Sequence, residues 1–262
     1  MAYPYFSNKY KDEGTITAKD IFLKSSDSIS KLPPPPKSCI LCPSDFIIKH
    51  LNKNNNLEED LKIIKPLYRL NNEIGIYTGF IGFGSPMWAW VLEQLIAYGI
   101  KNFIYIGFFG RVNQKIPKHK LIIVEKALRD EGLSFHYVKS SKWAYPDKDL
   151  TRGLLSEKGT ISSNLWTTDA MFKQTRKEIT HANRNNIVGF DMETSALFCV
   201  AKARKCKIAS IQIESDSFIN NRWKSVYQTK EFEHNLINAI NLAIKVLKDQ
   251  LLLENSKGCL SS

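Results

Sequence analysis

Short apolar runs alternate along the chain with longer stretches in which apolar residues recur every three or four positions. The short runs are rich in Ile, Val, Tyr and Phe, which is typical of buried β-strands. We expect strands at residues 38–42, 74–83, 101–107, 120–129, 133–138, 160–169, 186–193 and 207–215. The stretches with helical spacing predict helices. These cover residues 46–53, 86–98, 149–159, 172–184, 194–205 and 229–253.

The alternation of strands and helices predicts an α/β fold. We expect a three-layer α/β/α sandwich whose central mixed, mainly parallel sheet is covered by helices on both faces. Four consecutive prolines, 33–36, cannot continue a helix or join a central strand, so residues 1–37 are expected to form an N-terminal arm. Residues 38–253 would form a single domain, interrupted by a polar loop at 52–60, and residues 254–262 a flexible tail.

Composition and charge restrict the classes of protein to which the chain can belong. At 43% hydrophobic residues the chain can bury a core, and it carries neither a signal peptide nor a membrane-spanning run, so a cytoplasmic protein is expected. The formal charge of +11 comes from lysines spread along the chain rather than from a basic stripe with a nucleic-acid motif. Nucleic acid is therefore not the expected partner, whereas a small anionic ligand would be compatible with the charge.

The five cysteines do not form a recognisable metal site. Cys39 and Cys42 are spaced as Cys-x-x-Cys, but the second ligand pair that zinc would require is missing. Apolar flanking residues favour buried core thiols, and a redox pair is the alternative. We expect neither a metal nor another cofactor.

Three sequence features lie where predicted strands end, which is where ligands bind in such folds. A Gly-x-x-Gly pair, Gly107 and Gly110, could bring backbone amides near a ligand, or it could be a simple tight turn. Glu193 lies at the junction of a strand and an apolar helix, where a carboxylate could hold a sugar diol or merely complement the helix dipole. Asp216 follows an apolar strand and could transfer a proton to a leaving base, or could form an Asx turn.

Taken together, these segments resemble the nucleoside phosphorylase/uridine phosphorylase superfamily, which also contains the methylthioadenosine-type nucleosidases. The resemblance runs from about Ser38 to about Asp249, and its segments keep the family's order and spacing. FDMETSAL (190–197) resembles the family's Met-Glu ribose signature, and ESDS (214–217) resembles the Ser-Asp of the purine-cleaving branch. The other matching segments are GFGSPMWAWVLEQLIAYGIKNFIYIGFFGRVN (82–113), GLSFHY (132–137) and TTDAMF (167–172).

The resemblance assigns a role to each matching position. Met192 and Glu193 would hold the ribose, and Asp216 would protonate the base as the glycosidic bond breaks. Met171 or Phe172 would lie beside the base. Gln174 and Arg176 are similar to a uracil-reading Gln-x-Arg pair after a one-residue gap, although surface polarity explains them equally well. The resemblance also implies a homo-oligomer, a dimer or a hexamer.

The phosphate-binding positions of the family depart from its pattern. Tyr105 stands in place of an arginine and a phenylalanine in place of a threonine, and an apolar lining cannot compensate a dianion. Arg69 and Arg111 are the arginines that could replace the missing charge, although neither stands at the expected position. The loops facing the acceptor would comprise Ser44, Gly84, Ser85, Gly107, Phe108, Phe109 and Gly110.

We therefore expect hydrolytic cleavage of the N-glycosidic bond of a ribonucleoside, preferably a purine or modified purine, with Asp45 helping to activate water. Phosphate-dependent phosphorolysis is the first alternative, and a non-catalytic nucleoside-binding or storage protein is the second. An enlarged, aromatic pocket for an unusual substrate also fits Phe108 and Phe109, whereas core packing is favoured for Trp88 and Trp90.

Overall fold

The computed structural model describes residues 4–6, 8–25, 32–52, 57–117, 120–220 and 222–258. The strands in this part of the chain are β1 (Ser38–Cys42), β2 (Glu58–Lys62), β3 (Pro66–Arg69), β4 (Ile74–Thr78), β5 (Asn102–Arg111), β6 (Leu121–Asp130), β7 (Trp143–Ala144), β8 (Thr160–Thr168), β9 (Ile187–Asp191), β10 (Lys207–Ile219) and β11 (Arg222–Ser225). The α-helices are α1 (Ala18–Ser25), α2 (Phe46–Leu51), α3 (Ser85–Tyr98), α4 (Lys148–Leu155), α5 (Arg176–Arg184), α6 (Thr194–Ala203) and α7 (Lys230–Gly258). Short 3-10 helices span η1 (Lys9–Lys11), η3 (Leu133–His136) and η4 (Met171–Lys173).

The described strands form one mixed sheet in the order β11-β10-β6-β8-β9-β5-β1-β4-β3-β2, with β7 beside β6. Strand β5 also pairs with β10, so β10, β6, β8, β9 and β5 close into a ring. The parallel pairings join β1 to β4 and β5, β5 to β10, and β8 to β6 and β9. The predicted α/β class with a central mixed sheet is confirmed.

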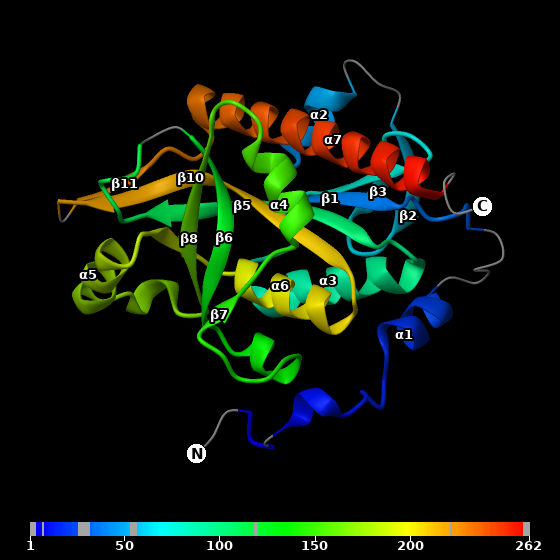
Figure 1. Ribbon diagram of the computed structural model, residues 1–262, viewed down its shortest axis with the longest axis horizontal. Helices are drawn as coiled ribbons and strands as arrows, with labels where there is room; N and C mark the ends of the chain where they lie inside the picture. The colour runs from blue at the N-terminus through cyan, green and yellow to red at the C-terminus, as the bar shows by residue number, and fades with distance from the viewer. Residues whose placement is uncertain are drawn as a thin grey trace.

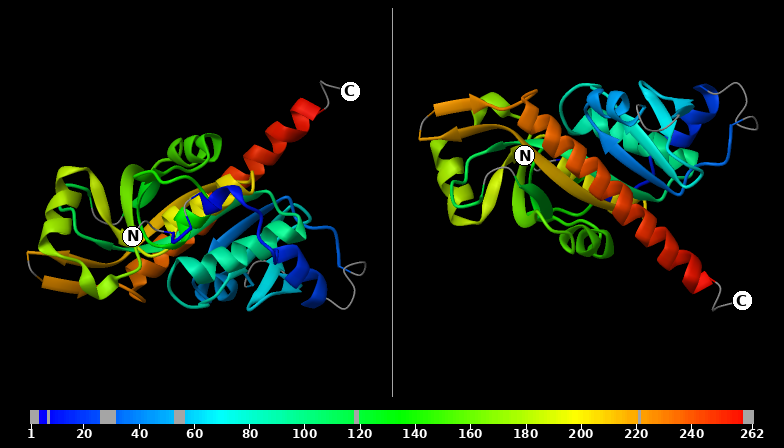
Figure 2. Two further views of the ribbon diagram at one scale, coloured as in Figure 1. Left: turned by 90° about the horizontal axis from the view of Figure 1, so that it is seen from below. Right: turned by 90° about the horizontal axis from the view of Figure 1, so that it is seen from above.

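Alternating side chains of the strands divide the core into two layers. In β1, Cys39 and Leu41 face one apolar cluster, and Ile40 and Cys42 face the other. Helices α3 and α6 cover the first face, and α2, α4 and α7 cover the second (Figure 1). Figure 2 shows α7 lying diagonally across the sheet, with its C-terminal end projecting beyond it. Because Cys39 and Cys42 point to opposite faces, they cannot form the redox pair considered from the sequence, and burial raises the pKa of both thiols.

Several element boundaries differ from the predicted ones for local reasons. The predicted strand at 133–138 is instead the 3-10 helix η3, because the Glu131 carboxylate accepts a hydrogen bond from the Ser134 amide and starts a turn. The predicted loop at 52–60 gives way at its end to the charged edge strand β2, which pairs with β3. The strand predicted at 74–83 ends at Thr78, because the following loop turns at Gly79, Gly82 and Gly84 with φ of 115°, 118° and 95°.

The described parts of the predicted arm and tail contain helices. In the predicted arm, α1 packs against α3, and the Pro33 carbonyl accepts a hydrogen bond from the Tyr98 hydroxyl at 2.8 Å. Helix α7 continues through Gly258 into the predicted tail, whose residues 259–262 lie outside the described part of the chain. None of the helices described is both long enough and apolar enough to cross a bilayer.

Candidate functional site

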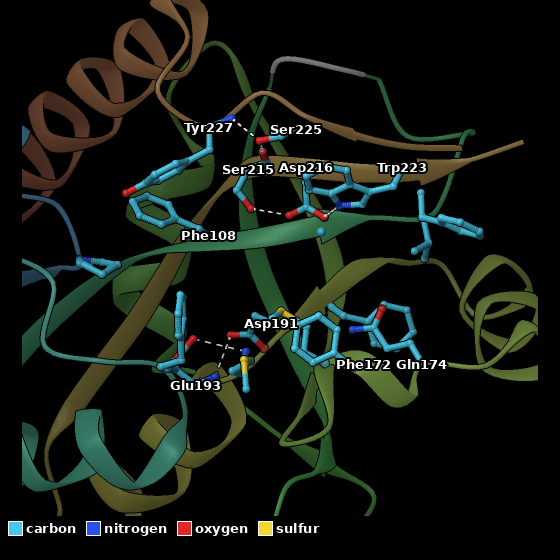
Figure 3. A pocket seen from close by; sticks show the side chains of 18 of the residues that line it. Phe108, Phe172, Gln174, Asp191, Glu193, Ser215, Asp216, Trp223, Ser225 and Tyr227 are labelled. Carbon is cyan, nitrogen blue, oxygen red and sulfur yellow. Dashed lines mark hydrogen bonds between the residues drawn. The ribbon is translucent and has the colours of Figure 1, made fainter. Parts of the chain in front are cut away.

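A cavity of about 850 Å³ opens where β1, β4, β5 and β10, which run parallel to one another, reach their carboxyl ends. Figure 3 shows two carboxylates, those of Glu193 and Asp191, on one wall and the Asp216 carboxylate on the opposite wall. Aromatic side chains make up much of the surface between them. The cavity is lined by Pro43, Phe80, Gly82, Phe83, Trp88, Tyr105, Phe108, Gly110, Val112, Met171, Phe172, Gln174, Ile179, Phe190, Asp191, Met192, Glu193, Ser215, Asp216, Phe218, Trp223, Ser225 and Tyr227.

Glu193 is only 7% exposed and stands at the junction of β9 and α6. Its Oε1 accepts a hydrogen bond from the Gly84 amide at 2.7 Å. Its Oε2 accepts from the Met192 amide at 3.3 Å and from the Tyr105 hydroxyl at 3.4 Å. These donors fix the carboxylate at the cavity wall and leave one lone pair, on Oε1, that can accept a hydrogen bond from a ligand hydroxyl.

Asp191 is a second buried carboxylate on the same wall. Its Oδ2 accepts from the amides of Glu193 and Thr194, and its Oδ1 accepts from the Thr167 hydroxyl at 2.6 Å. Burial raises the pKa of Asp191 to about 6. Burial, and next the negative charge of Asp191, raise the pKa of Glu193 to about 8. The two carboxyl groups together therefore hold a proton near neutral pH.

Asp216 is directed into the cavity by a local irregularity of β10. The register of β10 on β5 shifts between Glu214 and Asp216, so that Ser215 is the extra residue of a bulge. The Asp216 carboxylate accepts hydrogen bonds from the Ser215 hydroxyl at 2.8 Å and from Nε1 of Trp223 at 3.0 Å. A Cβ at Gly110 would lie 3.0 Å from Oδ2 of Asp216, so the glycine makes room for this carboxylate.

The predicted base-binding residues divide into two groups. Met171 and Phe172, on η4, and Gln174 line the cavity, and the Phe172 ring is 97% exposed at its mouth. Arg176 does not line the cavity, because it starts helix α5 on the solvent side. The helix start is fixed by a capping box between Thr175 and Glu178, which explains why α5 begins at Arg176, four residues later than predicted.

Most residues of the predicted acceptor loops lie outside the cavity lining. Phe108 and Gly110 line the cavity, whereas the others do not. Gly84 and Ser85 hold the opposite wall, through the Gly84 amide on Glu193 and the Ser85 hydroxyl on the Met192 carbonyl. The Ser44 carbonyl accepts from the Thr78 hydroxyl. The Phe109 side chain is buried in the core.

Gly107 and Asp45 also differ from their predicted roles. A Cβ on Gly107 would clash with the Gln212 amide and the Tyr105 ring, so this glycine makes room for these two side chains rather than contacting a ligand. The Asp45 side chain is largely exposed and pairs with Lys65 at 3.6 Å, outside the cavity lining.

The end of the cavity near β1 is aromatic. The rings of Phe108 and Tyr227 lie 6.0 Å apart, and both pack on Phe232 of α7 at 5.0 Å. Trp88 lines the cavity and packs on Tyr105 with ring centroids 5.5 Å apart, while Trp90 lies outside the lining. The predicted core role of Trp88 thus combines with a place at the cavity wall.

Within the described part of the chain, no Lys, Arg or His side chain lines the cavity. Arg111 is buried and pairs with Glu214 at 2.9 Å. Arg69 pairs with Asp60 and with the Pro34 carbonyl, at a separate depression lined by residues of β2 and the proline run. Neither arginine therefore supplies the charge that a bound phosphate would require. No group of His, Cys, Asp and Glu that could hold a metal occurs among the described residues.

Sequence reasoning missed several residues of the lining. Asp191 directly precedes the recognised Met-Glu pair, and its acidity was a usable signal. Trp223, Ser225 and Tyr227 come from the hairpin partner β11 and the loop after it, where the sequence predicts no strand. Phe80 and Phe83 lie in the loop that replaces the end of the predicted strand.

This chain is similar to a known protein family and to several individual proteins. The phosphorylase superfamily matches residues 46–251. A DeoD-type purine nucleoside phosphorylase of Buchnera aphidicola subsp. Baizongia pistaciae is 27% identical over 222 residues, which cover 80% of this chain and 92% of the relative. An uncharacterized protein of Acanthamoeba polyphaga mimivirus, R802, is 24% identical over 168 residues, covering 62% of this chain and 67% of that protein.

A solved structure shares the fold. Uridine phosphorylase from Vibrio fischeri superposes with a TM-score of 0.63 at 24% identity, covering 83% of this chain and 92% of that one. The same enzyme in complex with 6-hydroxy-1-naphthoic acid gives a TM-score of 0.65. Since the family match extends over most of the chain, including both walls of the cavity, the chain belongs to the phosphorylase superfamily.

Proposed function

We propose that this protein is an enzyme that cleaves the N-glycosidic bond of a ribonucleoside by hydrolysis, with a purine or modified purine as the preferred base. One observation carries the proposal: the cavity combines carboxylates on opposite walls with an aromatic lining, and none of its described lining residues is cationic. The substrate would be a neutral small molecule, and water would be the acceptor.

One wall of the cavity would bind the ribose of the nucleoside, and the opposite wall would bind the base. Glu193, beside Met192, would hold the ribose by accepting a hydrogen bond from one of its hydroxyls through the lone pair that Oε1 keeps. Asp216 would lie beside the base and protonate it as the bond breaks. The base would rest against Phe172 and Met171, and Gln174 offers it an amide that can both donate and accept.

The reaction would pass through a positively charged, oxocarbenium-like ribose. The carboxylates of Asp191 and Glu193 lie on the ribose side, where negative charge stabilises such a transition state. Asp45 lies outside the lining, so the water molecule would be oriented by Asp191 or Glu193 rather than by Asp45.

The absence of cations from the described lining favours water over phosphate. A phosphate dianion in this cavity would lose its hydration without gaining a charged partner, and it would face three carboxyl groups. Phosphorolysis is the second candidate, and the names of the purine nucleoside phosphorylase and uridine phosphorylase relatives favour it.

Release of free base from a panel of ribonucleosides, with and without phosphate, tests the proposal. We expect purine release at equal rates in phosphate-free buffer and in buffer with excess phosphate, with free ribose as the second product. Strict phosphate dependence, with ribose 1-phosphate formed, would establish phosphorolysis instead. A protein that binds nucleosides but releases no base under either condition would be a binding or storage protein.

A further inference from the structure

We infer that Trp223 is a positioning residue for Asp216, whose indole N–H holds the carboxylate in the orientation that faces the base. This inference rests on the proposed function, because it assigns to Trp223 a role in the same proton transfer. The Nε1 atom of Trp223 lies 3.0 Å from Oδ2 of Asp216, on the opposite strand of the β10–β11 hairpin (Figure 3).

The register of the hairpin explains how the indole reaches the carboxylate. In the antiparallel pairing of β10 and β11, Trp223 lies opposite Phe218, and Ser225 lies opposite Asp216. The four side chains therefore share one face of the hairpin, and all four line the cavity. The contact from Trp223 to Asp216 is diagonal, over a separation that a long aromatic side chain can span.

Two donors fix the two oxygens of Asp216. The Ser215 hydroxyl donates to Oδ1 at 2.8 Å, and the indole donates to Oδ2. Each oxygen keeps a second lone pair, so the carboxyl group can carry a proton toward the base while both donors stay in place. An indole N–H only donates and adds no charge, which suits a cavity whose described lining contains no cation.

Core packing does not account for this tryptophan. Trp223 is 67% exposed, on an edge strand whose four residues are all exposed. Its neighbours Arg222 and Lys224 are polar, so the local sequence forms no apolar cluster that would bury the ring. The specific contact that the side chain makes within the site is its hydrogen bond to Asp216.

Two substrates with different leaving groups distinguish a variant that no longer positions the acid from one whose site is damaged in general. A purine is a poor leaving group unless it is protonated, whereas the nitrophenolate of 4-nitrophenyl riboside leaves readily without a proton. In Trp223→Phe we expect kcat for the purine nucleoside to fall about 10-fold or more, part of the roughly 100- to 10,000-fold that a positioned acid contributes. We expect kcat for the nitrophenyl riboside, and KM for both substrates, to change little.

Two further variants complete the experiment. Trp223→Gln retains an N–H donor and should recover part of the lost purine rate. Trp90→Phe changes a partly exposed tryptophan on α3 outside the cavity lining and should behave as wild type with both substrates. Thermal melting of each variant checks that the fold is kept.

Any of the following results would contradict the role of Trp223. A Trp223→Phe variant that matches wild type on the purine nucleoside, or that loses equal activity on both substrates, would overturn the role of Trp223 alone. A wild-type protein that cleaves neither substrate would overturn the proposed function and this role with it. A wild type that cleaves only the nitrophenyl riboside would show that Asp216 supplies no proton, and would also contradict the inference.

Discussion

Asp191 and Glu193 show how two residues separated by one position acquire different properties from their partners. Asp191 is held by the Thr167 hydroxyl and by two amides at the start of α6, which favour its ionised form and partly offset burial. Glu193 is also buried, and it carries the additional repulsion from Asp191. Glu193 therefore retains its proton to higher pH, and a ligand that needs its ionised form must overcome this repulsion.

The raised pKa values make stability depend on pH. Between about pH 4.5 and pH 8 the folded protein binds more protons at this pair than the unfolded chain does, so the contribution of the pair to stability falls as pH rises through that window. We expect Glu193→Gln to flatten this fall, by a few kcal/mol at most, since one unit of pKa shift corresponds to about 1.4 kcal/mol.

Thermal melting from pH 5 to pH 9 at constant ionic strength measures the effect. Glu58→Gln, which removes an exposed carboxylate on the edge strand β2, is the matched control and should leave the slope unchanged. A Glu193→Gln variant whose melting temperature follows pH as steeply as wild type would contradict the raised pKa.

The sequence could indicate the residues at the ends of strands but not those that a neighbouring strand brings to them. Glu193 ends one predicted strand and Asp216 follows another, and both line the cavity, although β10 continues past Asp216 to Ile219 instead of ending at residue 215. Trp223 and Tyr227 reach the cavity because β11 folds back on β10 as a hairpin, and β11 has no apolar run that would predict a strand. The asparagine at position 220 was an available signal, since asparagine tolerates the positive φ of a turn, and the structure gives Asn220 a φ of 52°.

Strand β5 lies at the centre of the site and joins its parts. It pairs with β10 along its whole length, with β1 at its beginning and with β9 at its end, and it presents Tyr105, Phe108 and Gly110 to the cavity. Its length was underestimated from the sequence, because the predicted strand stops at Gly107, where glycine usually ends a strand. Glycine is retained here because the side chains of Gln212 and Tyr105 fill the space that a side chain would need, which is a property of the packed sheet.

The two glycines of β5 should respond differently to the same substitution. In Gly107→Ala the new Cβ would lie 2.4 Å from Nε2 of Gln212 and 2.6 Å from Cε1 of Tyr105, inside the packed core, so we expect a loss of stability of about 1–3 kcal/mol. In Gly110→Ala the Cβ would lie 3.0 Å from Oδ2 of Asp216, so we expect a smaller stability loss and a clear loss of purine cleavage.

Denaturant unfolding together with kcat for a purine nucleoside distinguishes the two variants, and each serves as the control for the other. Equal loss of stability in both variants, with Gly110→Ala fully active, would show that Gly110 has no bearing on where the Asp216 carboxylate lies.

At the scale of the molecule, charge is distributed unevenly. The chain carries a formal charge of +11, yet the cavity contains Asp191, Glu193 and Asp216 and, among its described lining residues, no cation. The basic surface attracts anions from a distance, but salt screens this attraction beyond about 8 Å at physiological ionic strength. Inside the cavity, screening is weaker and the carboxylates lie close to any ligand, so the local field decides which ligands bind.

This distribution predicts discrimination between nucleosides and nucleotides. A nucleoside 5′-monophosphate would bring a doubly charged phosphate into a cavity whose described lining supplies no positive partner, so we expect its kcat/KM to be about 100-fold or more below that of the nucleoside. Because the cause is local, lowering the ionic strength should raise the long-range attraction without removing this difference. Comparable cleavage of both compounds would mean that a cation reaches the site from outside the described residues, and the case for water over phosphate would then lose its main support.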